Sequence, residues 1–189
     1  VSQAVHPHYR QVLRTYLWTN SRQLVEVPAR AGLTDLDALT AALDDETACA
    51  MVQYPNFFGA IESLQPVSDA AHRVGALAIA CVDPIALGVL KPPGEYDFDI
   101  VVGEGQGLGN AMGFGGPMLG LFACKQAHLR RIPGRIVGQT TDAEGRRGFV
   151  MTLRTREQDI RREKATSNIC TNEALCALAS TVFLASLGK

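Results

Sequence analysis

Short apolar runs alternate with stretches of helical character along most of the 189-residue chain. The apolar runs predict strands at residues 24–28, 47–54, 76–82, 100–102 and 120–123. Apolar spacing, capping residues and charge patterning predict helices at residues 6–19, 34–43, 66–74, 155–164 and 172–187. The run at 76–82 is almost unbroken, which is typical of a strand buried on both faces. This alternation predicts an α/β fold with a mainly parallel sheet and flanking helices.

Polar residues and glycines mark the boundaries of several elements. Residues 34–37 (TDLD) resemble a capping box that opens a helix at its first residue. Residues 136–153 predict a β-hairpin with its turn at 142–145. The chain contains no repeat, linker or low-complexity segment, so we expect residues 1–189 to form a single domain. Because helices lie close to both ends, we expect this domain to be the central part of a larger one.

Composition is that of an ordinary soluble globular protein, with 47% hydrophobic and 20% charged residues. No apolar run is long enough to span a bilayer, and no signal peptide is visible.

The net charge of −1 conceals an asymmetry along the chain. Residues 1–124 carry 6 Lys/Arg and 13 Asp/Glu, a balance of −7, whereas residues 125–164 carry 11 and 5, a balance of +6. The basic segment fits a solvated helix face or an acidic partner, and it lacks the interleaved aromatic residues that would stack on nucleic-acid bases.

The cysteines argue against disulfide and metal chemistry. The chain has five of them, an odd number without a Cys-x-x-Cys pair: Cys49, Cys81, Cys124, Cys170 and Cys176. Three lie in strand-like apolar runs, so we expect buried, reduced thiols in a cytoplasmic protein. No histidine has a cysteine or carboxylate at metal-ligand spacing, and we expect no metal site.

Candidate chemistry gathers where predicted strands end, because ligands of open α/β sheets bind at the carboxyl ends of strands. The three relevant segments are residues 54–59, the acid Asp83 and the glycine-rich residues 103–116. Each is also explained by a turn that glycine and proline shape. Asp83 directly follows an apolar strand, so it can either pair with a cationic ring nitrogen or cap the next turn. The glycines do not form a dinucleotide fingerprint, because Leu108 stands where its third glycine is needed.

Four longer motifs together resemble the glycine cleavage system P-protein family. They are residues 55–62 (PNFFGAIE), 90–96 (LKPPGEY), 133–138 (PGRIVG) and 156–172, which end in SNICTN. The resemblance covers essentially the whole chain, and the first motif is similar to the version in subunit 1 of the two-subunit bacterial enzyme. It implies the large domain of fold type I, aspartate aminotransferase-like enzymes that depend on pyridoxal phosphate. The segment before this domain and the C-terminal small domain would be missing.

The resemblance also implies a reaction and a set of partners. The family's glycine dehydrogenase (decarboxylating) uses pyridoxal phosphate to decarboxylate glycine, and it transfers the aminomethyl group to the lipoyl arm of H-protein. In the catalytic subunit a lysine on the turn after the strand at 100–102 holds the cofactor, and Gln106 falls at that position here. An amide cannot form an imine. We therefore expect the cofactor to be bound by the partner, the lysine-bearing subunit 2 of a heterotetramer.

Two roles stay open for the chain. It can complete the active site of its partner, with Asp83 and Asn56 as candidate cofactor contacts. Arg135, Asn168 and Thr171 are then candidate substrate or interface residues. The alternative is a purely structural assembly subunit with no active-site role. In both cases we expect no catalytic residue in this chain, an inactive isolated subunit, and no nucleic-acid or membrane partner.

Overall fold

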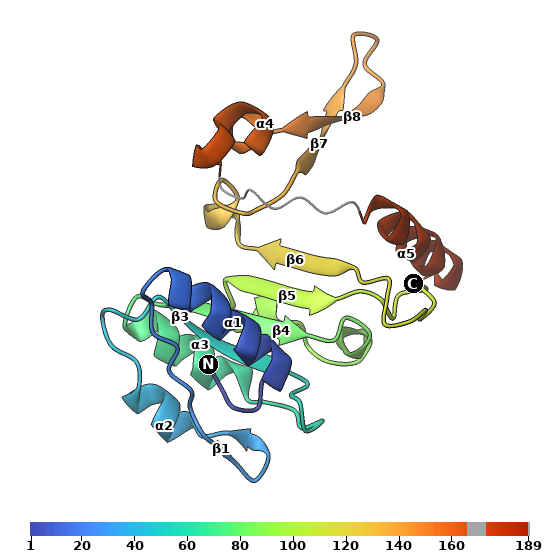
Figure 1. Cartoon of the computed structure of the whole chain (residues 1–189). Coiled ribbons are helices and arrows are strands. Elements are labelled where there is room, and N and C mark those ends of the chain that lie inside the picture. The colour runs from blue at the N-terminus through green and yellow to red at the C-terminus, as the bar shows by residue number, and fades with distance from the viewer. Residues whose placement is uncertain (166–172, 189) are drawn as a thin grey trace. The chain divides into compact units, whose positions relative to one another are not determined.

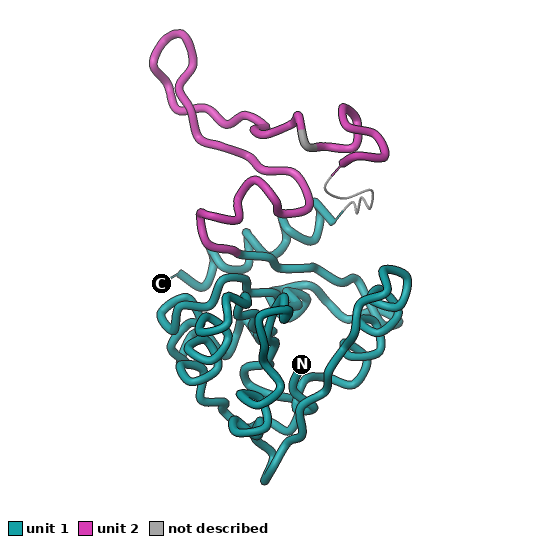
Figure 2. Tube along the Cα trace, turned by 90° about the vertical axis from the view of Figure 1, so that its left-hand side faces the viewer, with its two compact units in different colours: residues 1–123, 173–189 teal, residues 124–172 magenta. Residues whose placement is uncertain are grey.

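The structure is a computed structural model of the chain, and it describes residues 1–165 and 173–188. Contacts divide the chain into two compact units (Figure 2). Unit 1 comprises residues 1–123 and 173–189, and unit 2 comprises residues 124–172. Each unit has a sheet of its own. A single domain over the whole chain stays a prediction.

Unit 1 is built on a four-stranded sheet (Figure 1). Its strands are β3 (Cys49–Tyr54), β4 (Leu77–Val82), β5 (Ile100–Glu104) and β6 (Gly120–Cys124), in that order across the sheet. The first three are parallel, and Tyr54, Val82 and Gly103 lie side by side near their carboxyl ends. β6 runs in the opposite direction at the edge of the sheet. The predicted mainly parallel α/β sheet is therefore confirmed, and its parallel strands end at one common edge.

The core of unit 1 lies between one face of this sheet and two helices, α2 (Leu36–Ala41) and α3 (Leu64–Arg73). Its most buried side chains, at most 2% exposed, include Val52, Leu64, Val67, Ala71, Ala78 and Ala80. Every second residue of β3 contributes to this core. The period of two is that of a strand with one fully buried face.

The second face of the sheet is only partly covered. In β4, Leu77 and Ile79 are half-buried between the buried alanines. Helix α1 (Pro7–Thr19), which the sequence predicts correctly, lies on this side and has no buried residue of its own. The prediction that residues 76–82 are buried on both faces is therefore wrong for Leu77 and Ile79, whereas Cys81 on the same face is buried.

The segment between α1 and α2 differs from the prediction. Residues 24–28 form no strand, and within them only Val27 makes an isolated bridge, to Ser2. A two-stranded ribbon of β1 (Ala29–Arg30) and β2 (Leu33–Thr34) follows instead. The residues between its strands, Ala31 and Gly32, adopt positive φ angles and make a tight reversal that apolar patterning does not reveal.

The capping residue of α2 is shifted by one position from the prediction. Asp35 caps the helix, and its Oδ1 accepts a hydrogen bond from the Ala38 amide at 3.0 Å. The Thr34 hydroxyl is buried and bonds instead to Glu62 Oε1 at 2.9 Å. A tertiary contact therefore decides which of two adjacent capping residues is used.

Unit 2 contains the predicted hairpin, formed by antiparallel strands β7 (Ile136–Thr141) and β8 (Arg147–Thr152). The predicted helix at 155–164 is wrong in extent. Only α4 (Gln158–Arg161) is α-helical, and short 3-10 turns flank it. Arg162 has a φ of 55°, and a left-handed residue cannot continue a right-handed helix.

The last predicted helix is confirmed as α5 (Ala174–Leu187), which belongs to unit 1. Its predicted first residue, Asn172, lies outside the described residues. Gly188 follows the helix with a φ of 78°, a conformation that favours glycine and ends the helix.

Candidate functional site

A cavity of about 600 Å³ lies at the carboxyl ends of β3, β4 and β5, on the face of the sheet that α1 covers partly. Its walls are mainly apolar, and its polar side chains are Tyr9, Gln53, Cys81, Asp83 and Glu104. The parallel register explains the grouping, because Gln53 pairs with Cys81 and Cys81 pairs with Val102 across the three strands. Residues two apart along each strand then share this face.

Asp83 is the acid that the sequence singles out, and the structure places it on the wall of the cavity. Its side chain is exposed, and its Oδ1 accepts a hydrogen bond from the Ile85 amide at 2.9 Å. The turn-capping role is therefore present in the structure. Contact of Asp83 with a cofactor stays a prediction.

Burial controls the ionisation of the two weak acids in the cavity. Burial raises the pKa of Cys81 to about 12, so its thiol stays neutral at neutral pH and cannot act as a thiolate nucleophile. The pKa of Tyr9 is also raised, first by burial and then by nearby Cys81 and Glu104. A neutral thiol and a neutral phenol therefore accompany the carboxylates of the site.

Gln106 lies just past β5, but its side chain is not on the cavity wall, although Glu104 and Gly107 on either side of it are. The Gln106 amide nitrogen Nε2 donates to the Asn110 carbonyl at 2.6 Å. Its backbone N–H donates to Glu104 Oε1 at 2.9 Å. The structure therefore does not bring Gln106 and Asp83 together around one ligand.

Asn56 is buried, and it uses both ends of its amide inside the protein. Its Nδ2 donates to the Gly32 carbonyl at 2.7 Å and to Glu62 Oε1 at 2.8 Å. Its Oδ1 accepts from the Phe58 and Ala60 amides at 3.0 and 3.1 Å. This arrangement shapes the loop after β3, whereas a cofactor contact of Asn56 stays a prediction.

Sequence reasoning missed the acid at the centre of this network. Glu62 is 6% exposed and accepts hydrogen bonds from Asn56 and from the backbone and hydroxyl of Thr34. The Thr34 hydroxyl also contacts Ser2 Oγ at 2.8 Å. Three segments far apart in the chain are joined by these bonds, and no local spacing in the sequence announces such a junction.

His72 is a second residue whose environment the sequence does not reveal. It lies on α3, where its Nε2 is 2.7 Å from Asp99 Oδ2 and its Nδ1 is 3.4 Å from Asp97 Oδ2. Asp99 is buried, and its Oδ2 also accepts a hydrogen bond from the Ala78 amide. These contacts join α3 to the segment that leads into β5, although the His72 side chain stays partly exposed.

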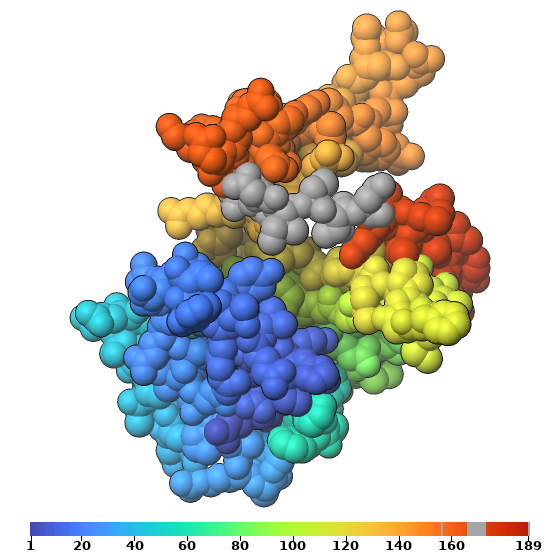
Figure 3. All heavy atoms as spheres, viewed as in Figure 1, coloured from blue at the N-terminus to red at the C-terminus, as the bar shows by residue number. Residues whose placement is uncertain are grey.

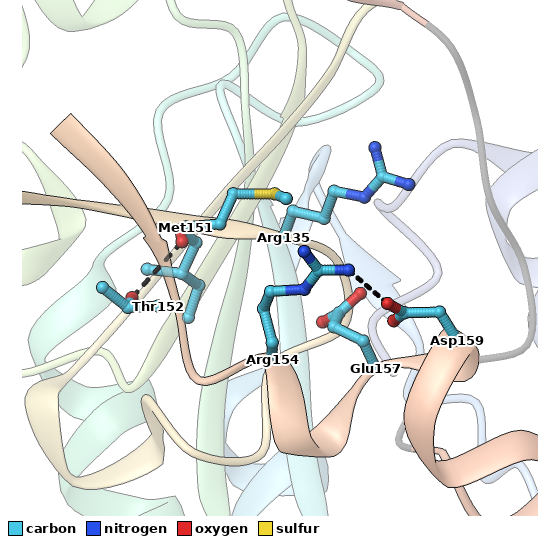
Figure 4. Close-up of a pocket in the computed structure, with 7 residues that line it drawn as sticks. Arg135, Met151, Thr152, Arg154, Glu157 and Asp159 are labelled. Atoms are coloured by element: carbon cyan, nitrogen blue, oxygen red, sulfur yellow. Dashed lines mark hydrogen bonds and ion pairs between the residues drawn. The ribbon is translucent and has the colours of Figure 1, made fainter.

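Arg135 lies in unit 2, at the start of β7, and is exposed (Figure 4). It lines a small pocket together with Met151, Arg154 and Asp159. The ion pair between Arg154 and Asp159 lowers the pKa of Asp159, and the charge of Arg135 adds a smaller effect. Asn168 and Thr171 lie outside the described residues, so the roles of all three candidates stay predictions.

The described residues contain neither a metal-binding cluster nor a membrane-spanning helix. Residues 1–165 and 173–188 contain no group of three or more His, Cys, Asp or Glu side chains that could hold a metal ion. Within the same ranges, no helix has both the length and the apolar character to cross a membrane.

The sequence matches the family model of the glycine cleavage system P-protein over residues 1–189. The chain is 56% identical over its full length to "Probable glycine dehydrogenase (decarboxylating) subunit 1" of Desulforamulus reducens. It is 57% identical over 185 residues, 98% of the chain, to the protein of the same name from Carboxydothermus hydrogenoformans. The chain spans 42% of the length of each of these relatives.

Comparison with solved structures also points to the P-protein. A crystal structure of glycine decarboxylase (P-protein) of the glycine cleavage system, in inhibitor-bound form, matches with a TM-score of 0.93 and 53% identity. The match covers 99% of this chain and 42% of that one. Sphingosine-1-phosphate lyase of Burkholderia pseudomallei matches with a TM-score of 0.65 at 16% identity, over 100% of this chain and 40% of that one, which speaks to fold alone. These likenesses confirm the predicted fold type I architecture and the resemblance to subunit 1.

Proposed function

The chain belongs to the P-protein family of the glycine cleavage system, and from that premise we propose that it is part of the subunit of glycine decarboxylase that lacks the cofactor lysine. The complete enzyme would decarboxylate glycine and pass the aminomethyl group to the lipoyl arm of H-protein. The observation that carries the proposal is Gln106, an amide at the place where the resemblance expects an amine. A cytoplasmic enzyme with reduced cysteines fits this role.

The side chains of this chain do not fit covalent attachment of pyridoxal phosphate, which needs a primary amine. Lys91 lies outside the cavity wall, with its Nζ 4.4 Å from the centre of the Tyr96 ring. Lys125 and Lys164 belong to unit 2, and Lys189 lies outside the described residues. We therefore assign the covalent chemistry to the partner subunit and derive no step of it from this chain.

Uncovered apolar side chains around the cavity support a protein partner. On α1, Tyr9 is 43% exposed and Val12 is 52% exposed, and after β4 Ile85 is 57% exposed. All three side chains line the cavity itself. Exposed apolar side chains gathered near a cavity mark interaction surfaces, so this side of unit 1 is where we place the partner's active site.

The second candidate is a subunit that only assembles the complex. Arg135→Ala in the reconstituted two-subunit enzyme separates the two roles, with the exposed Arg131→Ala as control. Lost turnover with intact assembly, seen for Arg135→Ala alone, supports an active-site role for unit 2. Unchanged turnover in both variants supports the purely structural role for this unit.

The experiment that tests the proposal is co-purification of the chain with a lysine-bearing P-protein subunit, followed by glycine-dependent exchange of CO2. We expect a stable complex whose exchange activity neither subunit has alone. Exchange by this chain without the partner, or a partner that reaches full activity without it, contradicts the proposal.

A further inference from the structure

The loop that begins at the end of β5 is bound to helix α5 by a relay of hydrogen bonds. Gln106 Nε2 donates to the Asn110 carbonyl at 2.6 Å. The side chain of Asn110 then donates from its Nδ2 to Ser180 Oγ at 2.8 Å and to the Cys176 carbonyl at 3.4 Å. Ser180 is 5% exposed and is the one buried residue that the structure describes in α5. The loop and the helix lie against each other in Figure 3.

Gly109 brings the backbone of this loop into direct contact with α5. A Cβ at this position would lie 2.5 Å from the Cβ of Phe183, closer than two such carbons approach. Its φ is 85°, a conformation that side chains other than glycine rarely adopt. The glycine is therefore required by two independent constraints, the turn itself and the packing of Phe183 on it.

Glu104 holds the base of the loop. Its Oε1 accepts hydrogen bonds from the Gln106 amide at 2.9 Å and from the Leu119 amide at 2.7 Å. The next residue along, Gly120, donates its amide to Glu173 Oε2 at 3.1 Å, just before α5 begins. The first turn of α5 and the loop are thus attached to neighbouring positions at the start of β6.

Helix α5 needs polar contacts of this kind because its own sequence does not select a buried face. Apolar side chains surround it, and several remain exposed, among them Leu175 at 78% and Leu178 at 59%. Hydrophobic burial is non-directional, so it would accept several rotations of such a helix about its axis. A hydrogen bond to the single buried serine selects one rotation.

We propose that residues 105–110 form a docking seat for α5 and that Gln106 is a positioning residue of this seat. Gln106 stands where the catalytic relative is expected to carry its lysine. In this chain that position helps to fix the rotation of α5 about its axis. The docking claim is independent of the proposed function, and only the comparison with the lysine rests on it.

Amide hydrogen exchange of α5 in the full chain tests the seat. Gln106→Met keeps the length of the side chain and removes its donor, so we expect protection of the α5 amides to fall roughly three- to tenfold, as for loss of one neutral hydrogen bond. Gln126→Met, at an exposed glutamine of unit 2, is the matched control. Ser180→Ala should lower protection by a similar factor, and the double variant should lose less than the product of the two single effects.

A rescue variant distinguishes the relay from general damage to the loop. Gln106→Lys restores a nitrogen donor of similar reach, so α5 protection should return to within about twofold of the wild type. After treatment with pyridoxal phosphate and borohydride, residue 106 of this variant should carry no more adduct than the exposed Lys91, because its side chain is turned toward Asn110.

Unchanged protection in Gln106→Met and Ser180→Ala overturns the seat, as do multiplicative losses in the double variant. Preferential adduct formation at residue 106 of Gln106→Lys overturns the assigned side-chain direction. If Gln106→Met does not fold, α5 protection in Ser180→Ala and in Gln106→Lys tests the seat, and adduct formation at residue 106 of Gln106→Lys tests the side-chain direction. Failure of the proposed function shows separately, as absence of CO2 exchange by the wild-type chain with its partner.

Discussion

Two neighbouring strands of unit 1 end at the same edge of the sheet and present their polar side chains in different ways. After β4, the exposed Asp83 lines the cavity and only caps its own turn. After β5, the half-buried Gln106 bonds to Asn110 within its loop, and that loop bonds to α5. One strand end is open to a ligand or partner, whereas the other is occupied by a helix of the same chain.

This difference teaches that a place in the topology does not determine the direction of a side chain. Gly105 follows β5 directly, and its amide donates to the Leu119 carbonyl at 2.7 Å. A Cβ on Gly105 would lie 3.2 Å from that same oxygen, so the chain turns close against β6 at this point. The turn directs Gln106 away from the cavity that its neighbours Glu104 and Gly107 line.

The ionisation of the Cys81 thiol, on the β4 side of the comparison, gives the largest expected effect. Because its pKa is raised to about 12, the thiolate fraction at pH 8.5 should be roughly a thousandfold below that of an ordinary cysteine. Alkylation of Cys81 should therefore be slower than that of the half-buried Cys124 and Cys176 by at least two orders of magnitude, as peptide mass mapping would show.

The same shift gives a pH dependence of stability with a definite sign. The folded pKa lies above the ordinary value near 9, so the neutral Cys81 thiol contributes fully below pH 9. This contribution is lost as the pH rises from 9 to about 12. Cys81→Ala should abolish the loss of stability that ionisation of this thiol causes between pH 9 and about 12. The same pH dependence of stability in the variant and the wild type would contradict the burial of Cys81.

Gly109→Ala should give the next largest effect, on the β5 side. The added Cβ meets Phe183 and strains a φ of 85°, so we expect a loss of about 2–4 kcal/mol in the free energy of unfolding. Gly115→Ala is the control, because Gly115 has a φ of 89° and nothing within 4 Å of the added carbon. It should cost about 1 kcal/mol, and equal losses in urea unfolding of the two variants would show that α5 does not pack on the loop.

Glu104→Ala should cost about 1–3 kcal/mol, because it leaves the amides of Gln106 and Leu119 without their acceptor. Glu104→Gln retains an oxygen and should recover more than half of that loss. Glu95→Ala removes an exposed carboxylate 3.8 Å from Lys91 and should change stability by less than about 0.5 kcal/mol. Urea unfolding of the three variants measures the ranking, and a Glu104→Ala loss no larger than that of Glu95→Ala would contradict it.

Asp83→Asn should have the smallest effect on stability, below about 0.5 kcal/mol, because asparagine can also cap the turn through the Ile85 amide. In the reconstituted enzyme the same variant reports on the proposed role of the acid. Reduced CO2 exchange at unchanged stability would show that the open strand end contributes to the shared site. Unchanged exchange would restrict Asp83 to the turn.

The sequence predicts the parts of the fold that depend on local pattern. Apolar runs and turn residues identify β3 to β6 and the hairpin of unit 2, and helical spacing identifies α1, α3 and α5. Parallel strands in sequence order then place Asp83 and Gln106 near one edge of the sheet. Family motifs add the expectation of a lysine that this chain lacks.

Features that depend on long-range contacts are not visible in the sequence. The bonds of Glu62 to Thr34 and Asn56, and of Asn110 to Ser180, join residues far apart in the chain. The glycines after β5 indicate a turn, but not that Gly109 packs against the side chain of Phe183 on α5. The tertiary fold decides which residues a loop contacts, and the spacing of residues in the sequence does not reveal these contacts.

The central claim is that this chain leaves the covalent chemistry of the cofactor to its partner. The most direct measurement is borohydride reduction of the reconstituted wild-type enzyme with pyridoxal phosphate, followed by peptide mass mapping of both subunits. We predict a stoichiometric adduct on a lysine of the partner, and no adduct on Lys91, Lys125, Lys164 or Lys189 above the level of a denatured control. A stoichiometric adduct on any lysine of this chain, lost together with activity when that lysine is replaced, would contradict the claim.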